Sequence, residues 1–156
     1  MPNNEIEKQY NELRKKLKLP DFKEIDFEFE ISSLEQTNFL LREIIRRIAE
    51  RLDFYSTMLE EVLQPDASNL YAMHETRFFD QTEKNHMYDL YRILMNLNRQ
   101  SIEITLEHTD KSEADYISGF LNDWRQIKQD LIKLVKKMRA SWKTDMDIKE
   151  DIGYLG

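Results

Sequence analysis

Three stretches of the chain, residues 33–63, 82–107 and 112–143, repeat apolar side chains at intervals of three and four. This spacing gathers the apolar side chains on one face of an α-helix. Each stretch opens with a serine or threonine, which favours a helix start, and none contains a proline. The pattern therefore predicts three long helices. Their expected core seams are Leu41, Ile48, Tyr55 and Val62; Met87, Leu90, Leu94 and Leu97; and Ile117, Phe120, Trp124, Ile127 and Leu131.

Two shorter patterns precede these helices. Within residues 1–18, apolar side chains at helical spacing predict a short N-terminal helix over about 5–17. Within residues 19–31, Phe27, Phe29 and Ile31 alternate with acidic residues, which is the period of a strand. A lone strand has no partner here, so this segment is predicted to be an extended strap that lies in a groove between helices.

The connections predict how the helices are arranged. The short link over residues 108–111 makes the helices on either side of it antiparallel neighbours. Residues 64–79 are long enough to cross one end of a bundle. We expect an all-α fold: an up-down-up bundle of three long helices, with the short N-terminal helix and the extended strap packed against it. Residues 1–156 should form one domain, with core helices over 33–143 and an acidic C-terminal tail over 144–156.

Composition narrows the class of protein. Charged residues make up 34% and hydrophobic residues 40%, and no run approaches the roughly 20 apolar residues of a membrane span. The chain has no cysteine, which excludes disulfides and thiol catalysis, and its N-terminus lacks the pattern of a secretory signal. We expect a cytoplasmic protein with no membrane contact. The net charge of −7 disfavours nucleic acid as a partner.

The most irregular segment, residues 66–80, is the best candidate for a ligand or partner site. It is too apolar for a solvated loop, and it adds polar residues of both charges, namely His74, Glu75, Arg77 and Asp80. Arg51, which falls on the apolar seam of residues 33–63, could join them. The favoured interpretation is structural: the segment plugs one end of the bundle and His74 is merely hydrogen-bonded.

Other candidate chemistry is weak. Glu83 and His86 form a single Glu-x-x-His pair, whereas a di-iron bundle needs two such pairs and further carboxylates, so we expect no metal and no cofactor. Residues 125–143 hold seven cations against one anion, Asp130. These cations spread over every face outside the seam, as on a solvated helix, and not along one face as on a helix that binds a polyanion.

The stretch 82–107 has more apolar residues than one core-facing stripe requires, because Tyr88, Tyr91, Ile93, Met95 and Ile102 lie outside its seam. Either the strap and the N-terminal helix cover this extra surface, or another chain does. Gly119 costs about 1 kcal/mol within a helix, which a close approach of another backbone would explain.

The leading hypothesis is a non-catalytic protein, an adaptor or assembly factor, that binds a protein partner or itself through residues 82–107. One alternative is a small-ligand-binding bundle or enzyme with its site at residues 66–80. The other is nucleic-acid binding through the basic C-terminal helix.

Overall fold

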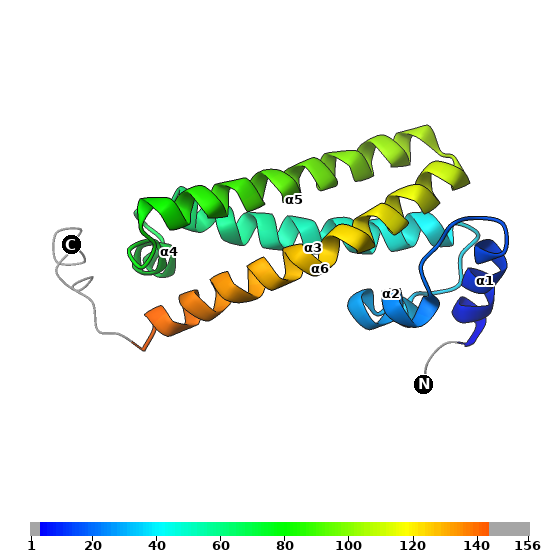
Figure 1. Ribbon diagram of the computed structural model, residues 1–156, viewed down its shortest axis with the longest axis horizontal. Coiled ribbons are helices and arrows are strands. Elements are labelled where there is room, and N and C mark those ends of the chain that lie inside the picture. Colours follow the sequence, from blue (N-terminus) through cyan, green and yellow to red (C-terminus); the bar gives the residue numbers. More distant parts are fainter. Residues whose placement is uncertain (1–3, 144–156) are drawn as a thin grey trace. The chain divides into compact units, whose positions relative to one another are not determined.

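The computed structural model describes residues 4–143, and within them the chain is helical with no strand (Figure 1). The elements are α1 (Asn4–Arg14), α2 (Phe22–Phe29), the 3-10 helix η1 (Ile31–Ser33), α3 (Leu40–Leu63), α4 (Leu70–Thr76), α5 (Gln81–Glu107) and α6 (Asp110–Ser141). The prediction of an all-α fold is confirmed. The acidic tail over 144–156 lies outside the described residues, and the up-down-up order of the long helices stays a prediction.

The chain forms two compact units. The first combines Met1–Asp53 with Met95–Arg125, and the second combines Phe54–Leu94 with Gln126–Gly156. The long helices α3, α5 and α6 each contribute residues to both units. The assignment of residues 1–156 to one domain stays a prediction, and the units are described separately below.

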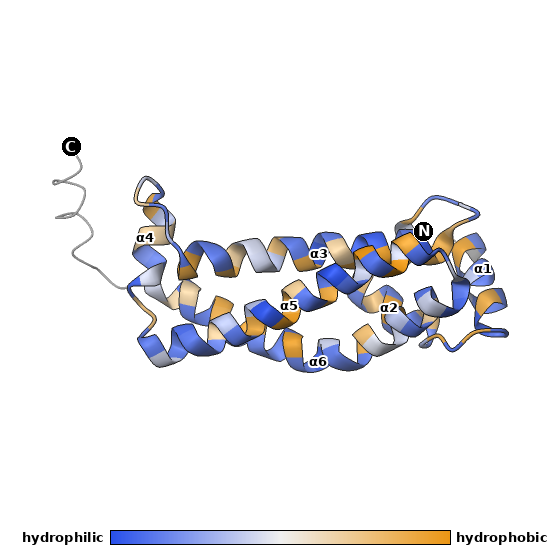
Figure 2. Ribbon diagram, turned by 90° about the horizontal axis from the view of Figure 1, so that it is seen from above, coloured by the Kyte–Doolittle hydropathy of each residue, from blue (hydrophilic) through white to orange (hydrophobic). Residues whose placement is uncertain are grey.

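Apolar and polar residues alternate along the long helices (Figure 2). In the first unit the fully buried side chains include Ile44, Ile48, Leu52 and Ile117, and in the second they include Leu59 and Met87. Ile48, Met87 and Ile117 belong to the predicted seams, and Ile44, Leu52 and Leu59 extend the seam of α3 at helical spacing, so hydrophobic periodicity accounts for these buried positions. No helix within residues 4–143 has both the length and the apolar character that crossing a bilayer requires.

The extended strap predicted over residues 19–31 is wrong, because this segment folds into α2 and η1. The buried side chains are Phe22, Ile25 and Phe29, which follow helical spacing, whereas Phe27 is 79% exposed. The alternation of Phe27 and Phe29 was therefore not a strand pattern. Helix α2 ends at Phe29 and is followed by Glu30, its C-cap, whose left-handed backbone (φ 54°) turns the chain.

The first long helix, α3, also begins later than predicted, at Leu40 instead of Ser33. Side-chain hydrogen bonds favour a different structure before it. The amide of Ser32 donates to the Asp26 carboxylate at 2.7 Å, and the Ser33 hydroxyl donates to the Glu30 carbonyl at 2.7 Å. Bonds of this kind compete with helix formation, so residues 34–39 form a non-helical link.

In the first unit, α2 packs against α3 and α6 through its buried aromatic residue. The Phe29 ring lies 5.5 Å from the rings of both Phe120 and Trp124, and the Trp124 indole donates to Glu28 at 2.9 Å. From α3, the Arg47 guanidinium donates to the Phe29 carbonyl at 3.0 Å.

Gly119 lies within α6, and a Cβ atom placed there would meet no other atom within 4 Å. The close approach of another backbone that the sequence suggested is therefore wrong for the described chain.

Because alanine costs less backbone entropy in a helix, Gly119→Ala should raise the free energy of unfolding by about 1 kcal/mol. Urea denaturation followed by circular dichroism measures this change. The matched control Gln129→Gly, at an exposed position of the same helix, should lower stability by a similar amount. Destabilisation by Gly119→Ala would contradict the open surroundings.

Candidate functional site

The predicted site over residues 66–80 contains the short helix α4, which is capped by Asn69 through a 3.3 Å bond from the amide of Ala72 to its side chain. The buried His74 places Nε2 2.9 Å from the Ser141 carbonyl, and its ring stacks on Trp142 with centroids 4.0 Å apart. The Trp142 indole donates to Glu75 at 3.2 Å. His74 and Glu75 together therefore attach α4 to the end of α6 within the second unit.

The other predicted site residues are used elsewhere. Asp80 and Glu83 form a reciprocal capping box at the start of α5, with amide-to-carboxylate distances of 2.8 and 3.1 Å. Arg77 is exposed. Arg51 belongs to the first unit, where its guanidinium lies 5.9 Å from the centroid of the Phe29 ring. The structure thus brings His74 and Glu75 together at Trp142, and a ligand-binding role for these five residues stays a prediction.

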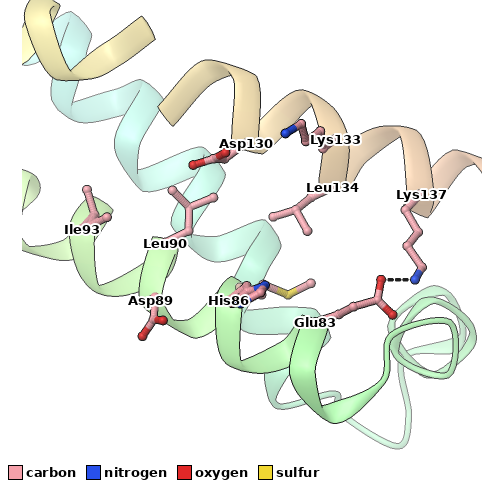
Figure 3. Close-up of a pocket in the computed structure, with 10 residues that line it drawn as sticks. Glu83, His86, Asp89, Leu90, Ile93, Asp130, Lys133, Leu134 and Lys137 are labelled. Atoms are coloured by element: carbon pink, nitrogen blue, oxygen red, sulfur yellow. Dashed lines mark hydrogen bonds and ion pairs between the residues drawn. The ribbon is translucent and has the colours of Figure 1, made fainter. Parts of the chain in front are cut away.

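A groove of about 570 Å³ lies between α5 and α6 in the second unit (Figure 3). Its apolar wall consists of Met87, Leu90, Ile93 and Leu134. Figure 3 shows Leu90 and Leu134 pointing into the space between the two helices. Met87 and Leu90 are buried, whereas Ile93 is 47% exposed. The groove therefore offers apolar surface to an incoming group.

Charged residues surround this apolar wall. Glu83 forms an ion pair with Lys137 that links α5 to α6 (Figure 3). The ammonium group of Lys137 also lies 5.2 Å from the centroid of the Phe79 ring. Asp89 on α5 and Lys133 on α6 add charges of opposite sign. With Glu83 committed to Lys137 and to the cap, the Glu83 and His86 pair lacks a free carboxylate, and no cluster of three potential metal ligands occurs within residues 4–143.

The surplus apolar residues of α5 are evident from the sequence, but the groove beside them was not predicted. The signal was present as Leu90 and Ile93, which are three residues apart on α5 and therefore lie on the same side of the helix. The α6 side of the groove was missed, because Lys133 and Lys137 were assigned to a uniformly solvated surface. Among the cations of α6, Lys137 pairs with Glu83 and Arg125 with Glu24.

A second apolar surface occurs on α5 in the first unit. Ile102 and Leu106 are 48% and 74% exposed and border a groove of about 390 Å³ with Ile45 and Ala49 of α3. From the sequence, the strap and the N-terminal helix were one possible cover for the extra apolar residues of α5. These segments instead leave Ile102 and Leu106 largely exposed.

A buried carboxylate marks a third location, also in the first unit. Glu113, in the first turn of α6, is only 2% exposed, and its Oε2 atom has no hydrogen-bond partner within the described chain. The nearest cation is Arg42, whose Nε lies 3.8 Å from Oε1. Burial raises the pKa of the Glu113 carboxyl, and the positive charge of Arg42 offsets only part of this effect.

This raised pKa predicts a pH-dependent gain from Glu113→Gln. A carboxyl group with a raised pKa in the folded state stabilises the protein below its unfolded pKa, about 4.3, and this contribution is lost as pH rises through the folded pKa. The substitution should therefore raise the free energy of unfolding by about 1 kcal/mol at pH 7, and by less near pH 4. Thermal melts at both values test this, with the exposed Glu107→Gln as control. An equal gain at both values would contradict the raised pKa.

Three of these locations differ in what they can do chemically. The contacts of His74 and Glu75 attach α4 to the end of α6, the α5–α6 groove can hold apolar side chains between charges, and the buried carboxylate of Glu113 can accept a hydrogen bond. Catalysis, nucleic-acid binding and cytoplasmic location stay at the level of the sequence predictions.

No family of known proteins, no curated protein and no solved structure detectably matches this chain.

Proposed function

We propose that this protein is a non-catalytic adaptor or assembly factor, which holds an amphipathic helix of a partner protein in the α5–α6 groove of its second unit. The observation that carries this proposal is the apolar wall of the groove, with Ile93 47% exposed between charged residues. Exposed apolar surface with a polar rim is typical of protein-binding sites.

The dimensions of the groove favour a helix as the bound element. On α5 it extends from Glu83 to Ile93, and ten residue steps of 1.5 Å correspond to about 15 Å, or nearly three helical turns. A helix of that length offers apolar residues at positions i, i+3 or i+4, and i+7, which is the usual set of anchors for a groove. A volume of about 570 Å³ accommodates a few such side chains.

The charges beside the groove favour a partner with both signs. Lys133 on α6 would attract acidic residues on one flank of the bound helix, and Asp89 on α5 would attract basic residues on the other flank. Such rim charges contribute more to partner choice and association rate than to affinity. The partner is therefore an amphipathic helix with a mixed-charge polar face.

A photo-crosslinking experiment tests the groove directly. The probe is p-benzoylphenylalanine in place of His86, an exposed residue beside the groove, introduced into the full chain in its native host. We expect one major crosslinked protein, with the crosslink mapped by mass spectrometry to an amphipathic helical segment. Ile93→Glu should reduce its yield at least tenfold, since a charge cannot be buried without a partner.

The matched control is Ile102→Glu. Ile102 lies on the same helix, is the same residue type and is equally exposed at 48%, but it belongs to the first unit. Its substitution should leave the crosslink intact. If the crosslink were lost with Ile102→Glu and kept with Ile93→Glu, the partner would bind elsewhere and the proposal would be refuted. So would a homodimer in sedimentation velocity that dissociates on Ile93→Glu, because a second copy would then occupy the groove.

A further inference from the structure

A pocket of about 460 Å³ in the first unit lies between α1, the residues around the start of α3, and the first turn of α6. Its walls carry three carboxylates, from Glu12, Asp110 and Glu113, and two cations, from Lys16 and Arg42. The carboxylates outnumber the cations by one. Glu12 is also paired with Lys15 at 2.8 Å, so both charges occur in the pocket, and Glu113 is its buried carboxylate.

Glu113 is the unusual member of this set because its side chain is buried and incompletely bonded. Its Oε2 atom has no hydrogen-bond partner within residues 4–143, and the 3.8 Å contact of Oε1 with Arg42 is too long for a hydrogen bond. Buried polar groups nearly always have a partner, since leaving one unpaired is costly. A carboxylate oxygen can accept only from a donor, and a cationic donor satisfies it best.

Two of the donors that line this pocket have contacts of their own. The side-chain amide of Gln9 donates to the Thr37 carbonyl at 2.6 Å. The Arg42 guanidinium lies over the Phe39 ring, 4.5 Å from its centroid. Neither group completes the bonding of Glu113 Oε2.

We propose that this pocket binds a primary alkylammonium group, which donates a hydrogen bond to the Glu113 carboxylate. The volume of about 460 Å³ admits an alkyl chain the length of a lysine side chain, with Leu13 and Phe39 available to contact its carbons. The same group occurs on free amines and on lysine residues of other proteins. This pocket lies in the first unit, so the proposal is independent of the groove between α5 and α6.

Titration of the ¹⁵N-labelled full chain with small probes tests the proposal. n-Butylammonium should shift the amide signals of residues 110–114 with a dissociation constant on the order of 1 mM, as expected for so small a ligand. Tetramethylammonium has the charge but no N–H group, and should bind at least tenfold more weakly. Butyrate, of opposite charge, should not bind. Equal binding of tetramethylammonium, or no binding of n-butylammonium, would refute the proposal.

Two variants assign the contact. Glu113→Gln keeps the shape of the side chain and should weaken n-butylammonium binding at least tenfold, whereas Glu12→Gln removes an exposed carboxylate of the same pocket and should change it less than twofold. Equal effects of the two variants would mean that charge alone attracts the probe, and would overturn the assignment of Glu113. A folded ¹⁵N spectrum of Glu113→Gln excludes unfolding as the cause.

The source of the ammonium group is then distinguished by Nα-acetyl-lysine methylamide. Binding at least tenfold tighter than n-butylammonium would identify a lysine residue of a protein as the ligand. Binding weaker than n-butylammonium would identify a free amine. Either result supports the proposal, provided that Glu113→Gln abolishes it.

Discussion

Phe29→Ala should lower the free energy of unfolding by about 3–5 kcal/mol, the range for removing a fully buried phenylalanine. The ring contacts Phe120 and Trp124 of α6 and lies beneath the Arg51 guanidinium of α3. Its removal would leave a cavity at the point where α2 joins both helices. Urea denaturation followed by tryptophan fluorescence measures the loss, since Trp124 lies at this contact.

Phe27→Ala is the matched control for this experiment. Phe27 belongs to the same helix, but its side chain is 79% exposed, so the substitution should change stability by less than about 0.5 kcal/mol. An extended strap would place Phe27 and Phe29 on the same face and make both substitutions costly. Similar losses for the two variants would therefore contradict the helical structure of α2.

His74→Ala should lower the free energy of unfolding by about 2–3 kcal/mol. It removes the bond between Nε2 and the Ser141 carbonyl and the stacking on Trp142, each of which contributes about 1 kcal/mol, and it leaves a small cavity. Differential scanning calorimetry measures this loss. Amide exchange should show faster opening of α4 and of the last turn of α6, which lie in the second unit.

His86→Ala serves as the control, because His86 is an exposed histidine on α5, and it should change stability by less than about 0.5 kcal/mol. If His74→Ala were as stable as the control, the contacts of His74 would not be structural. A role for His74 in ligand binding would then gain support, and a thermal-shift screen of metabolites against both variants would be the next measurement.

The long helices were predictable because their signal is long and regular. Helix α5 was predicted from residue 82 and begins at Gln81, and α6 was predicted over 112–143 and spans Asp110–Ser141. In each, seven or more turns repeat the same apolar interval, so a single misplaced residue cannot change the period. Seam residues such as Met87 and Phe120 are buried as predicted.

Helix α2 was not predicted because its eight residues are too few to distinguish a helical period from a strand period. Phe27, Phe29 and Ile31 fit a strand, while Phe22, Ile25 and Phe29 fit a helix, and both sets share Phe29. Only the packing of Phe29 on α6 decides between them. The start of α3 was misplaced for a related reason, since the residues before it bond to α2 and its C-cap: the amide of Ser32 donates to the Asp26 side chain, and the Ser33 hydroxyl donates to the Glu30 carbonyl.

The pocket beside Glu113 could not be predicted from the sequence at all. Acidic residues in a first helical turn are ordinary, and Asp110 and Glu113 give no sign that one is buried. Burial of Glu113 depends on where α1 and the residues before α3 come to lie. Sequence periodicity on α6 carries no information about that placement.

Arg47 has a consequence for how the chain passes from α2 to α3. Its Nη1 group lies within hydrogen-bonding distance of three acceptors, the carbonyls of Phe29 and Glu30 at 3.0 and 3.3 Å and the Ser33 hydroxyl at 3.4 Å. One side chain thus contacts three acceptors at the turn around Glu30, the residue whose backbone is left-handed. Loss of the Arg47 contacts removes all three of these interactions at once. Residues 29–33 should therefore open as one cooperative unit and not residue by residue.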